Sequence, residues 1–294
     1  MKKKLSVFIS LLMVIALVFS LSACAEVENG SKIQRMKMVL TYTDANGEET
    51  ERTVQIKLYQ NFAPKTVAHF VKLAESGYYD GTVVSNIQSG WLEFGGYKSE
   101  NDKLVAYGND VETVDGEFSL NGWLGNSLKT SNVGALVMKR NYSLESDTKS
   151  AYNTAKGTVI VTLASGSKFK STEYCYFGLI CSDDECYTVT EDSATAKKTS
   201  LDAVKALADY KENADGITVY YYETTGEYYS MKKYTDDSGA SVTEYYKGAT
   251  ASSENLLEGD ELDDFNDIRN DSQKNCFLLT VPYTKITVKS IKKA

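Results

Sequence analysis

The stretch from Val54 to Gly96 constrains the fold of this 294-residue chain more than any other part. Apolar and polar side chains alternate over 54–59, which is the pattern of a strand with one buried face. Pro64 then opens a helix, because a proline at the first helical position loses no hydrogen bond. Apolar residues recur along one stripe of that helix, which Gly77 ends. The stretch therefore predicts a strand, a helix over 64–76, and two more strands, around 83–87 and 92–94.

Other strands are predicted on both sides of this stretch. The runs 32–42 and 50–59 are joined by Asn46-Gly47, which supplies the positive φ that a hairpin turn needs. Alternation also predicts a strand at 134–140. Residues 201–207 fit a short helix with Ser200 as its N-cap.

Ala63 to Thr82 (APKTVAHFVKLAESGYYDGT) and Ser89 to Gly96 (SGWLEFGG) resemble the opening of the cyclophilin family of peptidyl-prolyl isomerases. Later segments resemble, in order, the family's strand G-x-L-x-M-A-R, its Y-D-S-A-T-S-Q-F-F-I, its Y-A-V-F-G-K-V and its closing P-x-x-I-x-S-I. These segments are 134–140, 152–161, 174–180 and 282–291. The resemblance runs over 35–291 and implies one mainly β domain, a closed eight-stranded antiparallel β-barrel with two capping helices. A closed barrel exposes no strand edge.

The resemblance is interrupted over 213–275. Short β-type runs at 217–222, 228–234 and 242–246 predict a meander, and these runs hold eight tyrosines. Those rings could form a recognition face or could pack the meander against the barrel. In the acidic segment 254–271, three apolar residues spaced three apart predict an amphipathic helix with a solvated acidic face. They are Leu262, Phe265 and Ile268.

The resemblance implies a chemistry whose key cation is missing. Rotation about a prolyl peptide bond has a barrier of about 20 kcal/mol, which an isomerase lowers with an apolar pocket and preorganised donors. In the family an arginine of the segment F-H-R-V-I-P-G-F-M-I-Q-G-G-D serves this purpose, and the matching segment 84–97 has Asn86 in its place. An amide can donate a hydrogen bond, but it carries no charge. Arg140, on another strand, is the second catalytic candidate.

The resemblance also implies the substrate pocket. Phe94 and Thr158 stand where the family has glutamines, and Lys139 stands where it has a small alanine. The large apolar residues predicted for this pocket could equally pack the interior of the barrel. The predicted pocket residues are Trp91, Leu92, Phe94, Thr158, Ile160, Phe169 and Tyr174.

The N-terminus predicts export. Three lysines precede an apolar run that ends in Leu21-Ser22-Ala23-Cys24, which resembles a bacterial lipobox. We therefore expect a signal peptide over 1–23, a lipid on Cys24, a tether over 24–34, and a protein held at the outer face of the cell membrane. An uncleaved membrane anchor is the alternative.

Four cysteines remain, an even number, so the sequence allows either two disulfides or free buried thiols. They are Cys175, Cys181, Cys186 and Cys276. No metal is predicted, since their spacing matches no zinc pattern and the acidic segment lacks calcium-loop spacing. No cofactor is predicted. A net charge of −8 argues against nucleic acid. His69, on the first helix, is expected to be structural.

Two functions follow from these patterns. The first is a lipid-anchored peptidyl-prolyl isomerase acting on proline-containing segments of exported proteins, with catalysis weak or lost because of Asn86. The second is a non-catalytic module that binds peptides or proteins on a cyclophilin barrel.

Overall fold

A computed structural model describes residues 26–294 apart from 45, 142–147, 183–198 and 276. Its main sheet is a ring of antiparallel pairings, in which each strand bonds the next and β3 bonds β2 again. In ring order the strands are β2 (Ser31–Thr43), β14 (Thr287–Lys293), β4 (Thr82–Gln88), β5 (Trp91–Glu100), β8 (Val159–Thr162), β7 (Ala135–Met138), β9 (Cys175–Ile180) and β3 (Glu49–Tyr59). The short strands β1 (Val27–Glu28) and β6 (Lys103–Ala106) pair with β2 and β5. The predicted mainly β architecture is confirmed.

The larger apolar core is shared by the ring strands and two helices, α2 (Pro64–Glu75) and α3 (Ser200–Lys205). Phe70 of α2 and Val204 of α3 are both buried in it. Residue 206 continues α3 as the 3-10 turn η4 (Ala206–Lys211). The other short helical turns are η1 (Ser119–Asn121), η2 (Thr148–Ala151) and η5 (Ser253–Asn255).

The N-cap of α3 differs from the prediction. Thr199 is the cap, and it forms a reciprocal capping box with Asp202. Ser200 instead lies inside the helix, where its hydroxyl accepts a hydrogen bond from the Gln55 backbone N–H (2.9 Å). Ser200 therefore ties α3 to β3 rather than starting the helix.

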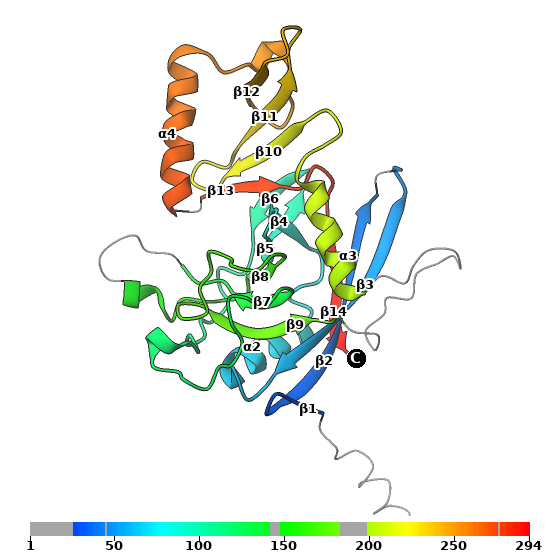
Figure 1. The fold of residues 1–294 in the computed structure, drawn as a ribbon, viewed down its shortest axis with the longest axis vertical. Helices are drawn as coiled ribbons and strands as arrows, with labels where there is room; N and C mark the ends of the chain where they lie inside the picture. Colours follow the sequence, from blue (N-terminus) through cyan, green and yellow to red (C-terminus); the bar gives the residue numbers. More distant parts are fainter. Residues whose placement is uncertain (1–25, 45, 142–147, 183–198, 276) are drawn as a thin grey trace, which may run out of the picture.

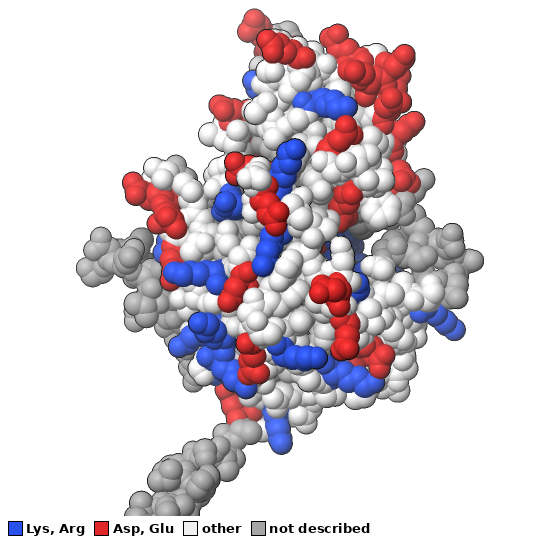
Figure 2. Space-filling model, turned by 180° about the vertical axis from the view of Figure 1, so that it is seen from behind, with Lys and Arg blue, Asp and Glu red and all other residues white. Residues whose placement is uncertain are grey.

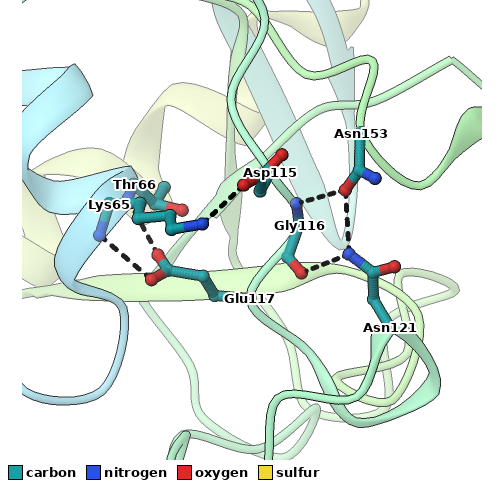
Figure 3. Close-up of polar contacts among 7 residues, drawn as sticks. All are labelled: Lys65, Thr66, Asp115, Gly116, Glu117, Asn121 and Asn153. Atoms are coloured by element: carbon teal, nitrogen blue, oxygen red, sulfur yellow. Dashed lines mark hydrogen bonds and ion pairs between the residues drawn. The ribbon is translucent and has the colours of Figure 1, made fainter.

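A buried carboxylate from a distant loop caps α2. The Ala63 N-cap provides no side-chain bond, so the first N–H groups of the helix need another acceptor. Glu117, 3% exposed, accepts hydrogen bonds from Lys65 N (3.0 Å) and Thr66 N (2.8 Å). Beside it, Asp115 pairs with the Lys65 ammonium, as Figure 3 shows. The negative charge at the N-terminus of α2 also interacts favourably with the helix dipole.

The neighbouring turn is held by amide side chains. Asn153 Oδ1 accepts from Gly116 N (3.0 Å) and from the amide of Asn121 (2.8 Å), which also donates to Gly116 O (2.7 Å). These bonds hold the loop that carries Glu117 against the chain around residue 153 (Figure 3).

We expect Glu117→Gln to lower the free energy of unfolding by about 1 to 3 kcal/mol in urea denaturation. The neutral amide can accept from only one of the two N–H groups and turns an NH2 group toward the other, which leaves a buried donor unsatisfied. Asp115→Asn is the matched control, because its pair with Lys65 is more than half exposed on both sides and should be worth at most about 1 kcal/mol. Equal effects of the two substitutions would contradict the capping role of Glu117.

The 213–275 segment builds most of a second sheet. The strands expected there are β10 (Ile217–Tyr222), β11 (Glu227–Thr235) and β12 (Ser241–Lys247). A fourth strand, β13 (Leu278–Val281), pairs with β10. The acidic segment forms the predicted helix, α4 (Gly259–Asn275), which lies beside this sheet in Figure 1. In Figure 2 acidic side chains gather on this upper part of the molecule.

Tyrosines pack on both faces of the second sheet. Tyr221 and Tyr228 lie in one cluster with Val83 and Leu104 of the ring. Tyr229 stacks on Phe265 of α4 at a centroid distance of 4.4 Å, and Tyr245 meets the same ring at a tilt, at 5.5 Å. These rings therefore pack the segment against the ring strands and α4, which is one of the two roles predicted for them.

One expectation near the N-terminus needs correction. The expected tether over 24–34 is partly strand, since residues 27–28 form β1 and 31–34 belong to β2. Ion pairs explain this order: Glu26 binds Arg35 (2.7 Å) and Glu28 binds Lys57 (3.1 Å). Cys24 and the expected signal peptide lie outside the described residues. No helix in the described ranges is long and apolar enough to cross a membrane.

Cys175 is a free, buried thiol and forms no disulfide. It contacts the Thr66 hydroxyl (3.1 Å), and burial raises its pKa to about 12. Such a thiol is unreactive. Cys181 is disulfide-bonded. Cys186 and Cys276 lie outside the described residues.

Candidate functional site

A cleft of 690 Å³ lies where the ring meets the second sheet. Strand β5 and the residues that follow β7 and precede β8 line it from the ring. The second sheet contributes residues beside β10 and β13. The residues that line the cleft include Trp91, Glu93, Tyr97, Lys139, Arg140, Thr158, Phe169, Tyr174, Glu223 and Phe277.

Three aromatic rings form one group on this cleft. Trp91 meets Phe169 edge to face at 5.1 Å, and Phe169 meets Tyr174 in the same way at 5.3 Å. Ile160 does not line the cleft; it is buried in the cluster that supports these rings. The rings therefore have fixed positions and present a firm apolar surface.

Arg140 stands beside this aromatic group and is 4% exposed. Its guanidinium lies 4.5 Å from the centre of the Tyr174 ring and 5.1 Å from that of Tyr152. Nε donates to the carbonyl of Glu173 (2.9 Å), and one Nη donates to the carbonyl of Asn141 (3.0 Å). Within the described residues, Arg140 has no carboxylate partner and its second Nη has no hydrogen-bond acceptor. A buried cation thus keeps donors for a ligand.

Asn86 does not line the cleft. Its side chain is 2% exposed, and its amide donates to the carboxylate of Glu93 (2.7 Å). Its carbonyl oxygen accepts from the backbone N–H of Thr280 in β13 (3.0 Å). Asn86 therefore joins the ring to the second sheet, and both ends of its amide are engaged.

Glu93 is the centre of a buried charge pair. It is 2% exposed and forms a salt bridge with Lys139 (2.6 Å). A carboxylate in this position needs a cation, because burial without one is costly. The large Lys139 side chain thus lies across the part of the cleft next to Asn86.

Glu223, at the end of β10, accepts a hydrogen bond from the Tyr97 hydroxyl of β5. Burial raises the pKa of Glu223, whereas Lys139 and the Tyr97 hydroxyl oppose the shift. Burial, together with the Glu223 carboxylate, also raises the pKa of Tyr97. This contact is a second polar link between the two sheets at the cleft.

Comparison with known proteins gives the family. Residues 43–206, more than half of the chain, match the model of the cyclophilin type peptidyl-prolyl cis-trans isomerase/CLD family. The chain belongs to this family. Among curated relatives, a peptidyl-prolyl cis-trans isomerase of Synechococcus elongatus is 43% identical over 49 residues, which are 16% of this chain and 34% of that protein. A peptidyl-prolyl cis-trans isomerase-like 1 of Neurospora crassa is 44% identical over 54 residues, 18% of this chain and 33% of that one.

This cyclophilin thus spans about a third of the length of the curated relatives it matches. Two crystal structures of a Cryptosporidium parvum cyclophilin type isomerase are also similar. The one in the presence of the dipeptide Ala-Pro is 20% identical and covers 52% of this chain and 81% of its own, with a TM-score of 0.35. The other is 19% identical and covers 58% and 95%, with the same TM-score of 0.35.

The structure divides the predicted pocket residues of this cyclophilin into two sets. Trp91, Thr158, Phe169 and Tyr174 line the cleft, together with the candidate Arg140. Leu92 and Phe94 do not, because they are buried in the larger core. On β5 alternate side chains face opposite sides, so Trp91 and Glu93 share the cleft face while Leu92 and Phe94 share the core face. A shift of one residue in an alignment reverses every such assignment.

Sequence reasoning missed Glu93 and Glu223 as cleft residues. Alternation from Trp91 would have placed Glu93 on the same face, two residues along the strand. Glu223 gives no comparable signal, because the contact between β10 and β5 joins segments more than a hundred residues apart. His69 is outside the cleft lining, and its Nε2 donates to the carbonyl of Lys156 (2.5 Å).

Proposed function

We propose that this cyclophilin binds proline-containing segments of exported proteins in the cleft and isomerises their prolyl bonds slowly. The observation that carries the proposal is the position of Arg140 beside the aromatic group of Trp91, Phe169 and Tyr174. An aromatic wall can hold the apolar pyrrolidine ring. A cationic donor in a site of low dielectric favours the twisted amide over the planar one, which lowers the barrier to rotation.

The activity should be low because Asn86 is uncharged and cannot replace a cation. Its amide is already bonded to Glu93 and to Thr280 N, so a substrate would have to compete for it. Arg140 would act alone, and from a different strand. Loss of one preorganised donor typically costs about 3 to 4 kcal/mol of barrier.

The cellular setting remains part of the proposal. We infer that a lipid on Cys24 holds the protein at the outer face of the cell membrane after removal of residues 1–23, as the lipobox-like sequence indicates. We also infer that the eight strands of the ring form the closed barrel. The rigid ring would then keep the cleft residues in fixed positions for a passing substrate.

A second function is a binding module without catalysis. The engagement of Asn86 favours it, and so does the presence of second-sheet residues on the cleft. In that case proline segments bind on the aromatic group and leave unchanged. The two functions share the cleft and differ only in whether Arg140 reaches the prolyl amide.

The cleft can be tested through its tryptophan, because the chain has only two. A soluble peptide with one Ala-Pro bond should change the fluorescence of a Trp123→Phe variant, in which Trp91 is the only reporter. Trp91→Ala should weaken binding of the same peptide at least about tenfold in calorimetry, since a buried aromatic contact is worth about 1.5 to 3 kcal/mol. Acceleration of cis–trans exchange in this peptide, measured by NMR, tests catalysis directly.

Trp123→Ala is the matched control. Trp123 donates to the Phe62 carbonyl (2.7 Å) and is absent from the cleft lining, so its loss should leave peptide affinity unchanged. Binding without faster exchange would favour the second function. Failure of the peptide to bind at all would reject both.

A further inference from the structure

The second sheet supplies a charged residue to the cleft for which the ring has no salt-bridge partner. Glu223 lies on the lining with Thr224 and Phe277, which also belong to this part of the chain. The Tyr97 hydroxyl donates to the Glu223 carboxylate and holds it at the junction of the sheets. A hydroxyl satisfies one lone pair, but it does not neutralise the charge.

The lysines around the cleft have other contacts. Lys139 forms its salt bridge with Glu93, which is the more deeply buried of the two acids, and it favours the charged form of Glu223 without forming a salt bridge with it. Lys156 donates to the carbonyl of Asn109, and Lys168 lies 4.9 Å from the centre of the Trp91 ring. In the part of the chain that the structure describes, Glu223 forms no salt bridge.

A second observation on the same cleft indicates that a ligand binds there. Arg140 is only 4% exposed, and one of its Nη groups has no acceptor among the described residues. Arg140 lines the cleft, so this donor is available to a carbonyl of a bound segment. The cleft therefore offers a guanidinium N–H donor to a peptide backbone and a half-buried carboxylate to a side chain.

We propose that Glu223 is a specificity-determining residue that binds a positively charged side chain, Lys or Arg, flanking the proline of the bound segment. The incoming cation would complete an arrangement in which Glu93 and Glu223 each have one cation. The inference rests on the proposed function, because it concerns the same cleft. It assigns to the second sheet the selection of substrate, while Trp91 of the ring holds the prolyl ring and Arg140 acts on the prolyl amide.

The test compares peptides that differ only in charge. A set with one Ala-Pro bond carries Lys, Ala or Glu immediately before the Ala or immediately after the proline, and affinities are measured by calorimetry at low salt. The wild-type protein should bind the better Lys peptide about tenfold more tightly than its Ala counterpart, as expected for a partly desolvated charge pair, and the Glu peptide more weakly. Raising the salt concentration should reduce this preference.

Two variants isolate the carboxylate. Glu223→Gln keeps the size of the side chain and an acceptor for Tyr97, and it should bind the Lys and Ala peptides equally. Glu227→Gln is the matched control, because Glu227 pairs with Lys247 on the second sheet and does not line the cleft. It should keep the wild-type preference.

The outcomes separate the inference from the proposed function. Equal affinity of the wild-type protein for Lys and Ala peptides overturns the inference and leaves the proposed function intact. A Lys preference that survives in Glu223→Gln also overturns it. If none of the peptides binds, the inference fails together with the proposed function.

Discussion

Replacing Lys139 with alanine is expected to lower the free energy of unfolding by about 3 kcal/mol. The substitution removes the ammonium from Glu93, which is buried at 2% exposure and would be left as a buried charge without a cation. Breaking a buried pair in this way costs about 3 to 5 kcal/mol, and the lower end applies because the Lys139 side chain is 27% exposed. Asn86 would still donate one hydrogen bond to Glu93. Urea denaturation monitored by circular dichroism gives the value.

Adding Glu93→Gln to Lys139→Ala should recover most of this loss, because the buried carboxylate is then absent. Lys65→Ala is the control for an exposed pair, since Lys65 and Asp115 are 62% and 58% exposed and should contribute at most about 1 kcal/mol. If the double variant is as unstable as Lys139→Ala, the loss comes from packing of the lysine stem rather than from the charge on Glu93.

Replacing Arg140 with alanine is expected to lower the rate of prolyl isomerisation about a hundredfold while peptide affinity changes little. Arg140 is the buried cation next to the aromatic group, and a preorganised donor of this kind typically contributes a factor of about 100 to 1,000 in rate. Affinity depends mainly on the aromatic rings, which the substitution leaves in place. Exchange rates by NMR and affinities by calorimetry on the same peptide separate the two effects.

Arg140→Lys keeps the charge but lacks the planar fork that donates to Glu173 and Asn141, so we expect an intermediate rate. Arg269→Ala is the matched control. Its guanidinium also lies 4.5 Å from a tyrosine ring, that of Tyr245, but Arg269 is on helix α4 and is outside the cleft lining. A folded Arg140→Ala protein with the wild-type rate would remove Arg140 from catalysis.

Much of the ring was predictable from local patterns. The strands predicted at 32–42, 50–59 and 83–87 lie close to the observed bounds of β2, β3 and β4, and Pro64 marked the first residue of α2. The three apolar residues of the acidic segment predicted α4, and Phe265 is buried as that pattern requires. These predictions succeed because the spacing of side chains along one element decides which face is apolar.

The cleft was predictable only in part. Trp91, Phe169 and Tyr174 followed from the resemblance and do lie together, whereas Leu92 and Phe94 face the core. The reason is the two-residue period of a strand: neighbouring side chains face opposite sides, so Leu92 and Phe94 cannot share the cleft face with Trp91. Similarly, the N-cap of α3 is Thr199 rather than Ser200, because Ser200 bonds a backbone N–H of β3 that only the folded chain brings near.

The sequence by itself determined the family, the order of most ring strands and of helices α2, α3 and α4, and the absence of the arginine at Asn86. Only the tertiary structure decided that Asn86 bonds β13, that Glu93 takes Lys139, and that Glu223 reaches the cleft from the second sheet. Periodicity and motif spacing report on neighbours within one element, whereas these contacts join residues far apart in the chain. Burial of a charge requires a partner, but which distant side chain supplies it depends on how the two sheets pack.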